Sequence, residues 1–101
     1  MLLFIYGTLK RNEYNNQVLK GAKGKFISEG ETVLTHSLTF EAYPELHKDG
    51  DEFVKGEVWE IPEEHIDFID TFEGHPTFYK RDIIAIRTAK EFLICHTYFK
   101  V

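Results

Sequence analysis

The sequence predicts a single α+β domain, and three observations support this class. Segments of strand composition dominate the 101 residues, the two indicated helices are short, and no repeated strand–helix–strand pattern with long crossovers is present. With 43% hydrophobic and 15% aromatic residues, a chain of this length can build one compact core but not two independent ones. We therefore expect one domain over residues 1–101.

The N-terminal segments predict a buried strand and then a weakly patterned helix. Residues 2–6 form a continuous apolar run that ends at Gly7, which is typical of a strand covered on both faces. Residues 12–20 carry asparagines that favour a helix start, have apolar residues near their end and are followed by Gly21. This pattern predicts a short helix.

The chain up to residue 51 then predicts two strands and an exposed loop. Residues 23–34 have strand composition broken by Gly30, which indicates either a bulge or a bend at a barrel corner. Residues 38–40 predict a further strand. Proline, glycine and aspartate gather in residues 42–51, in proportions typical of an exposed loop with a turn.

The second half predicts a strand, a helix and a hairpin. Residues 53–61 alternate like a strand, Pro62 opens the helix with acidic residues in its first turn, and Gly74 ends it. The apolar residues of this helix recur at helical spacing: Ile66, Ile69 and Phe72. Residues 79–87 and 91–100 predict two strands whose short connection implies an antiparallel hairpin.

Charge and cysteine content narrow the class of partner and compartment. Seventeen acidic residues against twelve Lys and Arg give a net charge of −5, scattered along the chain, which argues against nucleic acid and other phosphate-rich partners. The single Cys95 lies in an apolar run and cannot form an internal disulfide, which favours a reducing compartment. Residues 1–5 lack a basic leader, and no run approaches the roughly 20 apolar residues of a membrane span. We expect a soluble cytoplasmic protein without a membrane partner.

A candidate anion-binding turn follows the first strand directly. In Tyr6-Gly7-Thr8-Leu9, the glycine can adopt a left-handed or extended turn that points successive backbone N–H groups at one anion. From this tetrapeptide alone, an ordinary turn is the commoner explanation. Neither GxxxxGK nor GxGxxG occurs, so the expected anion is a carboxylate rather than a nucleotide phosphate.

Glu73 is the candidate proton carrier. It precedes the helix-ending Gly74 and so lies at the negative end of the helix dipole, which disfavours an ionised carboxylate. Its neighbours, Phe72 on one side and Gly74-His75-Pro76 on the other, could also desolvate it, and both effects raise a carboxylate pKa toward the range of a general base. A solvated glutamate at a frayed helix end is the alternative.

Other chemistries find little support in the residues. The histidines show neither HExxH nor CxxC spacing, the serines lack a GxSxG context, and Asp49-Gly50-Asp51 is better explained as a turn than as a calcium loop. Tyr79 and Tyr98 lie on adjacent predicted strands, where a phenol can reach a pocket, although packing is the commoner outcome.

Two separated segments, taken together, resemble one known family. Phe4-Ile5-Tyr6-Gly7-Thr8-Leu9-Lys10-Arg11, and later Ile69-Asp70-Thr71-Phe72-Glu73-Gly74 followed by Tyr79-Lys80-Arg81, resemble the γ-glutamylcyclotransferase-like family. Shorter likenesses occur at Glu41-Ala42-Tyr43-Pro44, Gly56-Glu57-Val58-Trp59 and Cys95-His96-Thr97-Tyr98. Within the family, the chain is most similar to the γ-glutamylaminecyclotransferase group.

The resemblance implies a mixed, barrel-like sheet and an enzyme that needs no cofactor or metal. In this chemistry, the α-amine of a γ-glutamyl group attacks its own γ-carbonyl, which closes 5-oxoproline and releases an amine. The turn Tyr6-Gly7-Thr8-Leu9 would bind the substrate's α-carboxylate, Glu73 would move the proton, and Tyr79 and Tyr98 would contribute to the pocket. The expected partner is a small-molecule γ-glutamyl compound.

Two departures from the family pattern leave alternatives open. Asn12 stands where relatives often have glycine, and the sequence stops at Val101, so we expect a pocket without a C-terminal wall. Such a pocket indicates either a larger or peptide-bound γ-glutamyl substrate or a protein that binds without turnover. A non-catalytic module that binds a carboxylate ligand is the main alternative to an enzyme. A purely structural or interaction protein ranks last, since no large amphipathic stripe indicates a partner groove.

Overall fold

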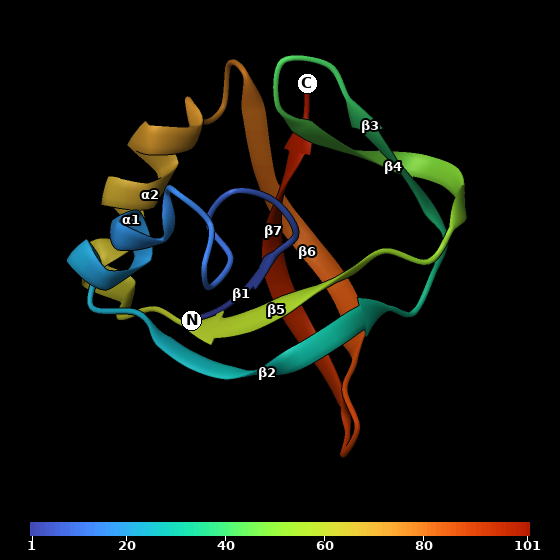
Figure 1. The fold of residues 1–101 in the computed structure, drawn as a ribbon, viewed down its shortest axis with the longest axis horizontal. Coiled ribbons are helices and arrows are strands. Elements are labelled where there is room, and N and C mark those ends of the chain that lie inside the picture. Colours follow the sequence, from blue (N-terminus) through green and yellow to red (C-terminus); the bar gives the residue numbers. More distant parts are fainter.

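Five strands close into a barrel in the computed structural model, which describes residues 1–101 (Figure 1). Their spatial order is β1 (Leu2–Ile5), β5 (Lys55–Glu60), β2 (Lys25–Thr32), β6 (Tyr79–Arg87) and β7 (Phe92–Lys100). Neighbouring strands are antiparallel except β1 and β7, which close the barrel in parallel with Leu3 opposite His96. The predicted α+β class, barrel-like sheet and C-terminal hairpin are confirmed.

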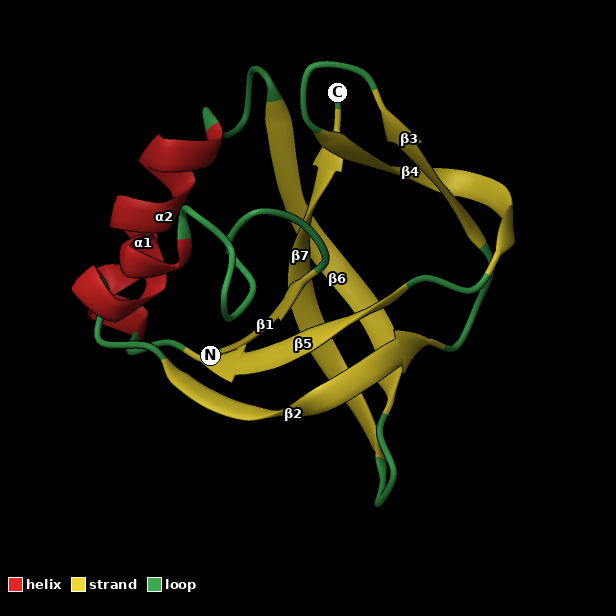
Figure 2. Ribbon diagram, in the orientation of Figure 1, coloured by secondary structure: helices red, strands yellow, loops and turns green.

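The helices and the remaining strands lie on opposite flanks of this barrel (Figure 2). On one flank are α1 (Asn16–Gly21), the 3₁₀ turn η1 (Glu63–His65) and α2 (Ile66–Glu73). The ring of His65 bonds to the carbonyl oxygen of Ala22 at 3.0 Å, which ties η1 to the end of α1. On the other flank, β3 (His36–Phe40) and β4 (Pro44–Glu52) form a two-stranded ribbon. None of the helices is long and apolar enough to cross a membrane.

Strand β1 is covered on both faces, as its continuous apolar sequence predicts. Leu3 and Ile5 belong to a cluster of ten buried residues that includes side chains of both helices, whereas Phe4 belongs to a second cluster of eight that includes Cys95 and Leu46. All three β1 residues are at most 3% exposed. The strand therefore links the two parts of the core.

The prediction of an exposed loop over residues 42–51 is wrong for most of its length. Strand β4 pairs with β3 from Phe40 opposite Pro44 to Ser37 opposite His47, and an irregularity then places His36 opposite Glu52. Leu46 is the one buried side chain of β4. Because this ribbon covers the core with so few positions, its exposed residues have a loop-like composition that hides the strand.

The prediction that Gly30 marks a bulge or a bend needs correction. The bulge in β2 lies between Phe26 and Ser28, while Gly30 pairs regularly with Gly56. A Cβ atom on Gly30 would lie 2.6 Å from Cγ2 of Ile86, so this glycine permits the close approach of β2 and β6.

Helix α1 begins at Asn16 rather than at residue 12. Asn12 has a left-handed backbone with a φ of 68°, which a right-handed helix cannot contain. The segment that Pro62 opens likewise starts with the 3₁₀ turn, whose cap residue is Pro62, before α2 begins. Both helices are therefore shorter than their sequence patterns suggest.

Asp70 joins α2 to the barrel. Its carboxylate accepts hydrogen bonds from Nε and Nη2 of Arg81 on β6, at 2.9 and 3.2 Å, and from the hydroxyl of Tyr98 on β7, at 2.6 Å. Burial opposes ionisation of Asp70, but the bonds from Arg81 and Tyr98 outweigh it and hold the pKa of Asp70 below its ordinary value. The carboxylate is therefore charged and paired at neutral pH.

We expect Asp70→Asn to lower the free energy of unfolding by about 3 kcal/mol, because it leaves the largely buried guanidinium of Arg81 without its counter-charge. Asp82→Asn is the matched control, since Asp82 pairs with Lys48 at the surface and should lose less than about 1 kcal/mol. Urea unfolding at pH 7 measures both. Equal losses in the two variants would contradict the anchoring role of Asp70.

Candidate active site

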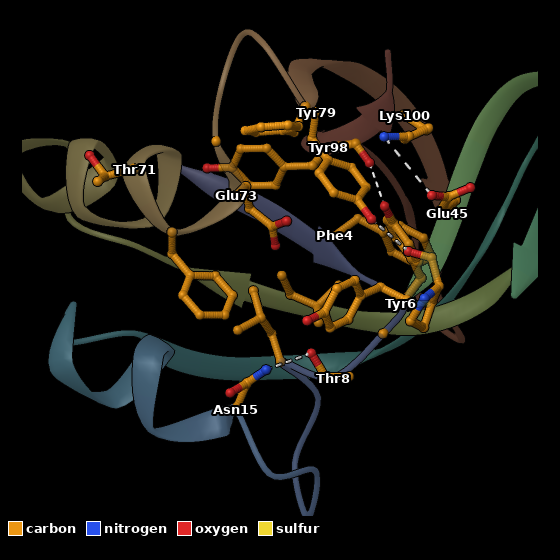
Figure 3. A pocket seen from close by; sticks show the side chains of 18 of the residues that line it. Phe4, Tyr6, Thr8, Asn15, Glu45, Thr71, Glu73, Tyr79, Tyr98 and Lys100 are labelled. Carbon is orange, nitrogen blue, oxygen red and sulfur yellow. Dashed lines mark hydrogen bonds and ion pairs between the residues drawn. The ribbon is translucent and has the colours of Figure 1, made fainter. Parts of the chain in front are cut away.

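A pocket of about 650 Å³ opens where the end of β1, the end of α2 and the start of β4 meet the β6–β7 hairpin (Figure 3). All seven site residues predicted from the sequence line it: Tyr6, Gly7, Thr8, Leu9, Glu73, Tyr79 and Tyr98. The fold thus brings together segments that are far apart in the chain. The roles assigned to these residues remain predictions.

The backbone carbonyls of the turn after β1 are engaged in hydrogen bonds, whereas its backbone amides are not. The carbonyl oxygens of Gly7, Thr8 and Leu9 accept hydrogen bonds from Lys10 N (3.2 Å), Asn15 N (3.1 Å) and Asn16 Nδ2 (2.7 Å). The amide N–H groups of the same three residues donate to no protein acceptor. A row of free N–H groups beside engaged carbonyls favours a bound anion.

Gly7 does not use a left-handed conformation in this turn, because positive φ values among the glycines occur only at Gly50 and Gly74. A Cβ atom at this position would lie 3.4 Å from the ring of Pro44, which is an ordinary van der Waals contact, so the start of β4 does not by itself require a glycine here.

Glu73 is the last residue of α2, and Gly74 ends the helix in a left-handed conformation with φ 70°. The amide of Gly74 bonds to the carbonyl of Thr71 and that of His75 to the carbonyl of Asp70, the pattern of a Schellman cap. The predicted helix end is therefore confirmed and is well ordered rather than frayed.

The carboxylate of Glu73 points into the pocket and has neither a hydrogen-bond nor an ion-pair partner in the protein (Figure 3). Burial raises the pKa of Glu73 from 4.5 to about 7. A carboxyl group with this pKa is partly ionised at neutral pH, so it can both accept and return a proton.

The three tyrosines of the site contribute their rings rather than free hydroxyls. The hydroxyl of Tyr6 donates to the carbonyl of Tyr98 at 2.5 Å, that of Tyr79 to the carbonyl of Pro44 at 3.2 Å, and that of Tyr98 to Asp70. Burial, and then the charge of Glu73, raises the pKa of Tyr79 to about 12; burial also raises the pKa values of Tyr6 and Tyr98. These phenols stay protonated and form the pocket wall.

The sequence did not reveal several residues at the pocket mouth. Phe72 was expected on the buried face of α2, but it is 45% exposed and lines the pocket. Three more exposed aromatic residues line it: Tyr14, Tyr43 and Phe78. Glu45 and Lys100 form a long ion pair of 3.9 Å on its wall. An aromatic residue outside the predicted helices and strands was the available signal for Tyr43 and Phe78 alone. No three His, Cys, Asp or Glu side chains gather as a metal site would require.

Comparisons with known proteins point to one family. The sequence model of the family described as gamma-glutamyl cyclotransferase, AIG2-like, matches residues 3–101. The chain is 34% identical over 98 residues to a gamma-glutamylaminecyclotransferase of Homo sapiens, with 89% of this chain and 64% of that protein covered. It is 33% identical over 93 residues to one of Rattus norvegicus, with coverages of 84% and 62%.

A crystal structure of an AIG2-like protein from Mus musculus superposes with a TM-score of 0.92 at 27% identity, covering 99% of this chain and 76% of that one. The chain spans a little under two thirds of the length of the human and rat relatives. The match of the family model over nearly all residues, together with this likeness in fold, shows that the chain belongs to the gamma-glutamyl cyclotransferase, AIG2-like family.

Proposed function

We propose that the protein is a cyclotransferase that converts a γ-glutamyl amine or isopeptide into 5-oxoproline and the free amine. One observation carries the proposal: an unpaired carboxyl group with a raised pKa shares a pocket with three unpartnered backbone amides. The names of the human and rat relatives, gamma-glutamylaminecyclotransferase, support an amine as leaving group.

The amides of Gly7, Thr8 and Leu9 would bind the α-carboxylate of the γ-glutamyl group. Hydrogen bonds from N–H groups to an ionised carboxylate are shorter and stronger than those between neutral groups. Nucleophile and electrophile belong to the same substrate, so a grip on the carboxylate can fold the chain until the α-nitrogen approaches the γ-carbon. The turn thus supplies orientation.

Glu73 would carry the proton. The substrate's α-ammonium gives one proton to the Glu73 carboxylate, and the freed amine attacks the γ-carbonyl to form the lactam C–N bond. The attacking nitrogen releases its second proton to solvent as this bond forms. The γ-amide C–N bond then breaks, and Glu73 returns the proton to the departing nitrogen. Both transfers suit a group whose pKa is about 7.

Incubation with γ-glutamyl-ε-lysine, γ-glutamyl alanine and simple γ-glutamyl amines, with detection of 5-oxoproline, tests this proposal. We expect Glu73→Gln to lower kcat by about 10²- to 10⁴-fold, the usual contribution of general acid–base catalysis, while 5-oxoproline still binds. Glu45→Gln is the control, because Glu45 is a pocket carboxylate already paired with Lys100. Turnover of Glu73→Gln at the wild-type rate would rule out Glu73 as the proton carrier.

A wild-type protein that binds 5-oxoproline or glutamate, yet releases 5-oxoproline from none of these compounds, would favour the non-catalytic binding module. The same assay therefore separates the two functions. Product release and ligand binding should be measured on one preparation, so that an inactive sample is not mistaken for a binding protein.

The pH dependence of kcat/KM should show the ionisation of Glu73. Because burial raises its pKa to about 7, the basic form is lost on acidification, and the rate should fall tenfold per pH unit well below pH 7. Steady-state kinetics from pH 3.5 to pH 9 measure this limb. An acid limb near pH 4.5, the ordinary value, would contradict a buried, unpaired carboxylate.

The same shift predicts how Glu73 affects stability. A carboxyl group whose pKa is raised by folding contributes stability below its unfolded pKa and loses it as the pH rises through its folded pKa. We therefore expect Glu73→Gln to match the wild type below pH 4.5 and to have a higher Tm above pH 7. Thermal unfolding at pH 4 and pH 8 compares them. A lower Tm for the variant at pH 8 would show that the ionised group is stabilised by a partner.

A further inference from the structure

Another buried carboxylate, that of Glu57, lies next to the strand end from which the amide-bearing turn begins. Glu57 is on β5 opposite Ile5, the last residue of β1 before the turn begins. It is 8% exposed. A carboxylate so well buried needs charged or polar partners, because desolvation of an unpaired charge is costly.

The partners of Glu57 come mainly from the far end of the same turn. Its Oε1 accepts the backbone N–H of Arg11 at 2.9 Å and Nε1 of Trp59 at 3.1 Å. Its Oε2 accepts Nε of Arg11 at 3.1 Å. Main-chain pairing with Ile5 and side-chain bonds to Arg11 therefore fix both ends of the turn on one residue of β5.

Other contacts hold Arg11 in this position. Its guanidinium lies 3.6 Å above the ring of Phe26, and Nη2 lies 3.6 Å from a carboxylate oxygen of Glu29. The ring of Phe26 in turn packs edge-on against Trp59 with centroids 5.8 Å apart. The stack keeps the guanidinium beside Glu57, where it balances the buried charge.

We propose that Glu57, through Arg11, is a positioning residue that keeps the free amides of residues 7–9 directed at one point in the pocket. The inference rests on the proposed function for its effect on turnover, but not for its effect on the turn. Glu57 touches no ligand. Its carboxylate holds the turn closed, and an anion site works only if its donors stay within a fraction of an ångström of their places.

Glu57→Gln tests this role, because glutamine keeps the size of the side chain. It replaces one carboxylate oxygen, which accepts a hydrogen bond from Arg11, with an amide nitrogen, which can only donate. In the absence of ligand, backbone ¹⁵N heteronuclear NOE values at residues 7–9 should fall in the variant. The Kd for 5-oxoproline should rise roughly tenfold or more, the loss of one hydrogen bond to a charged group. KM should rise more than kcat falls, and the acid limb of kcat should stay in place because Glu73 is unchanged.

Arg11→Met gives a milder, independent variant. The backbone N–H of Arg11 and Nε1 of Trp59 still donate to Glu57, so the buried carboxylate keeps two of its three hydrogen bonds while it loses its counter-charge, and the Tm of the variant measures that cost. We expect a threefold or greater rise in the 5-oxoproline Kd, on the order of the contribution of one partly exposed ion pair. Ile86→Val, in the core cluster that contains none of residues 7–9, is the control: it should lower the Tm and leave both the NOE values and the Kd unchanged.

Three outcomes would overturn the inference: unchanged NOE values at residues 7–9 in Glu57→Gln, wild-type Kd in Arg11→Met, or equal weakening of binding by Ile86→Val. Failure of the proposed function is a separate result. A wild type that releases no 5-oxoproline would refute the activity, while the NOE values of the unliganded variants would still decide whether Glu57 orders the turn.

Discussion

Strand β1 pairs with β7 in the one parallel contact of the barrel, and the pocket depends on this contact. Thr97 Oγ1 donates to the backbone carbonyl of Phe4 at 2.9 Å, and the hydroxyl of Tyr6 donates to the backbone carbonyl of Tyr98. These bonds place the turn after β1 beside Tyr98. The hydroxyl of Tyr98 donates to the carboxylate of Asp70 and so holds α2, whose last residue is Glu73, against the barrel. One closure of the sheet therefore fixes both halves of the candidate site.

Three carboxylates around the pocket illustrate how surroundings divide the work among residues of the same chemistry. Asp70 and Glu57 are buried with full sets of donors, so they hold structure: Asp70 holds the helix that ends at Glu73, and Glu57 holds the turn. Glu73 has no partner, and burial therefore raises its pKa instead of being offset. An unpaired group is unfavourable for stability, and such groups are found where proton transfer is needed.

Much of this arrangement follows from local sequence patterns, and the remainder depends on distant contacts. The strand composition of residues 79–87 predicts β6 at its observed bounds, and Gly74 predicts the end of α2. The partners of Glu57 and Asp70 could not be assigned, because Arg11 is 46 positions from Glu57 and Arg81 is 11 from Asp70. A glutamate on the same strand face as Trp59 does indicate a buried charge, but not which cation balances it. Strand β4 was hidden because only one of its side chains is buried.

The closure of the barrel also has a consequence for the order of folding. The residues that join β1 to β7 are 93 positions apart, and contacts between distant parts of a chain form slowly because they close large loops. During synthesis β1 emerges before β7, so the edge of β1 that pairs with β7 has no partner until β7 follows. We therefore expect the pocket, which needs both strands, to form only after β7 has paired. Ligands that recognise the finished pocket bind only the fully folded chain, so they would draw the folding equilibrium toward the closed barrel.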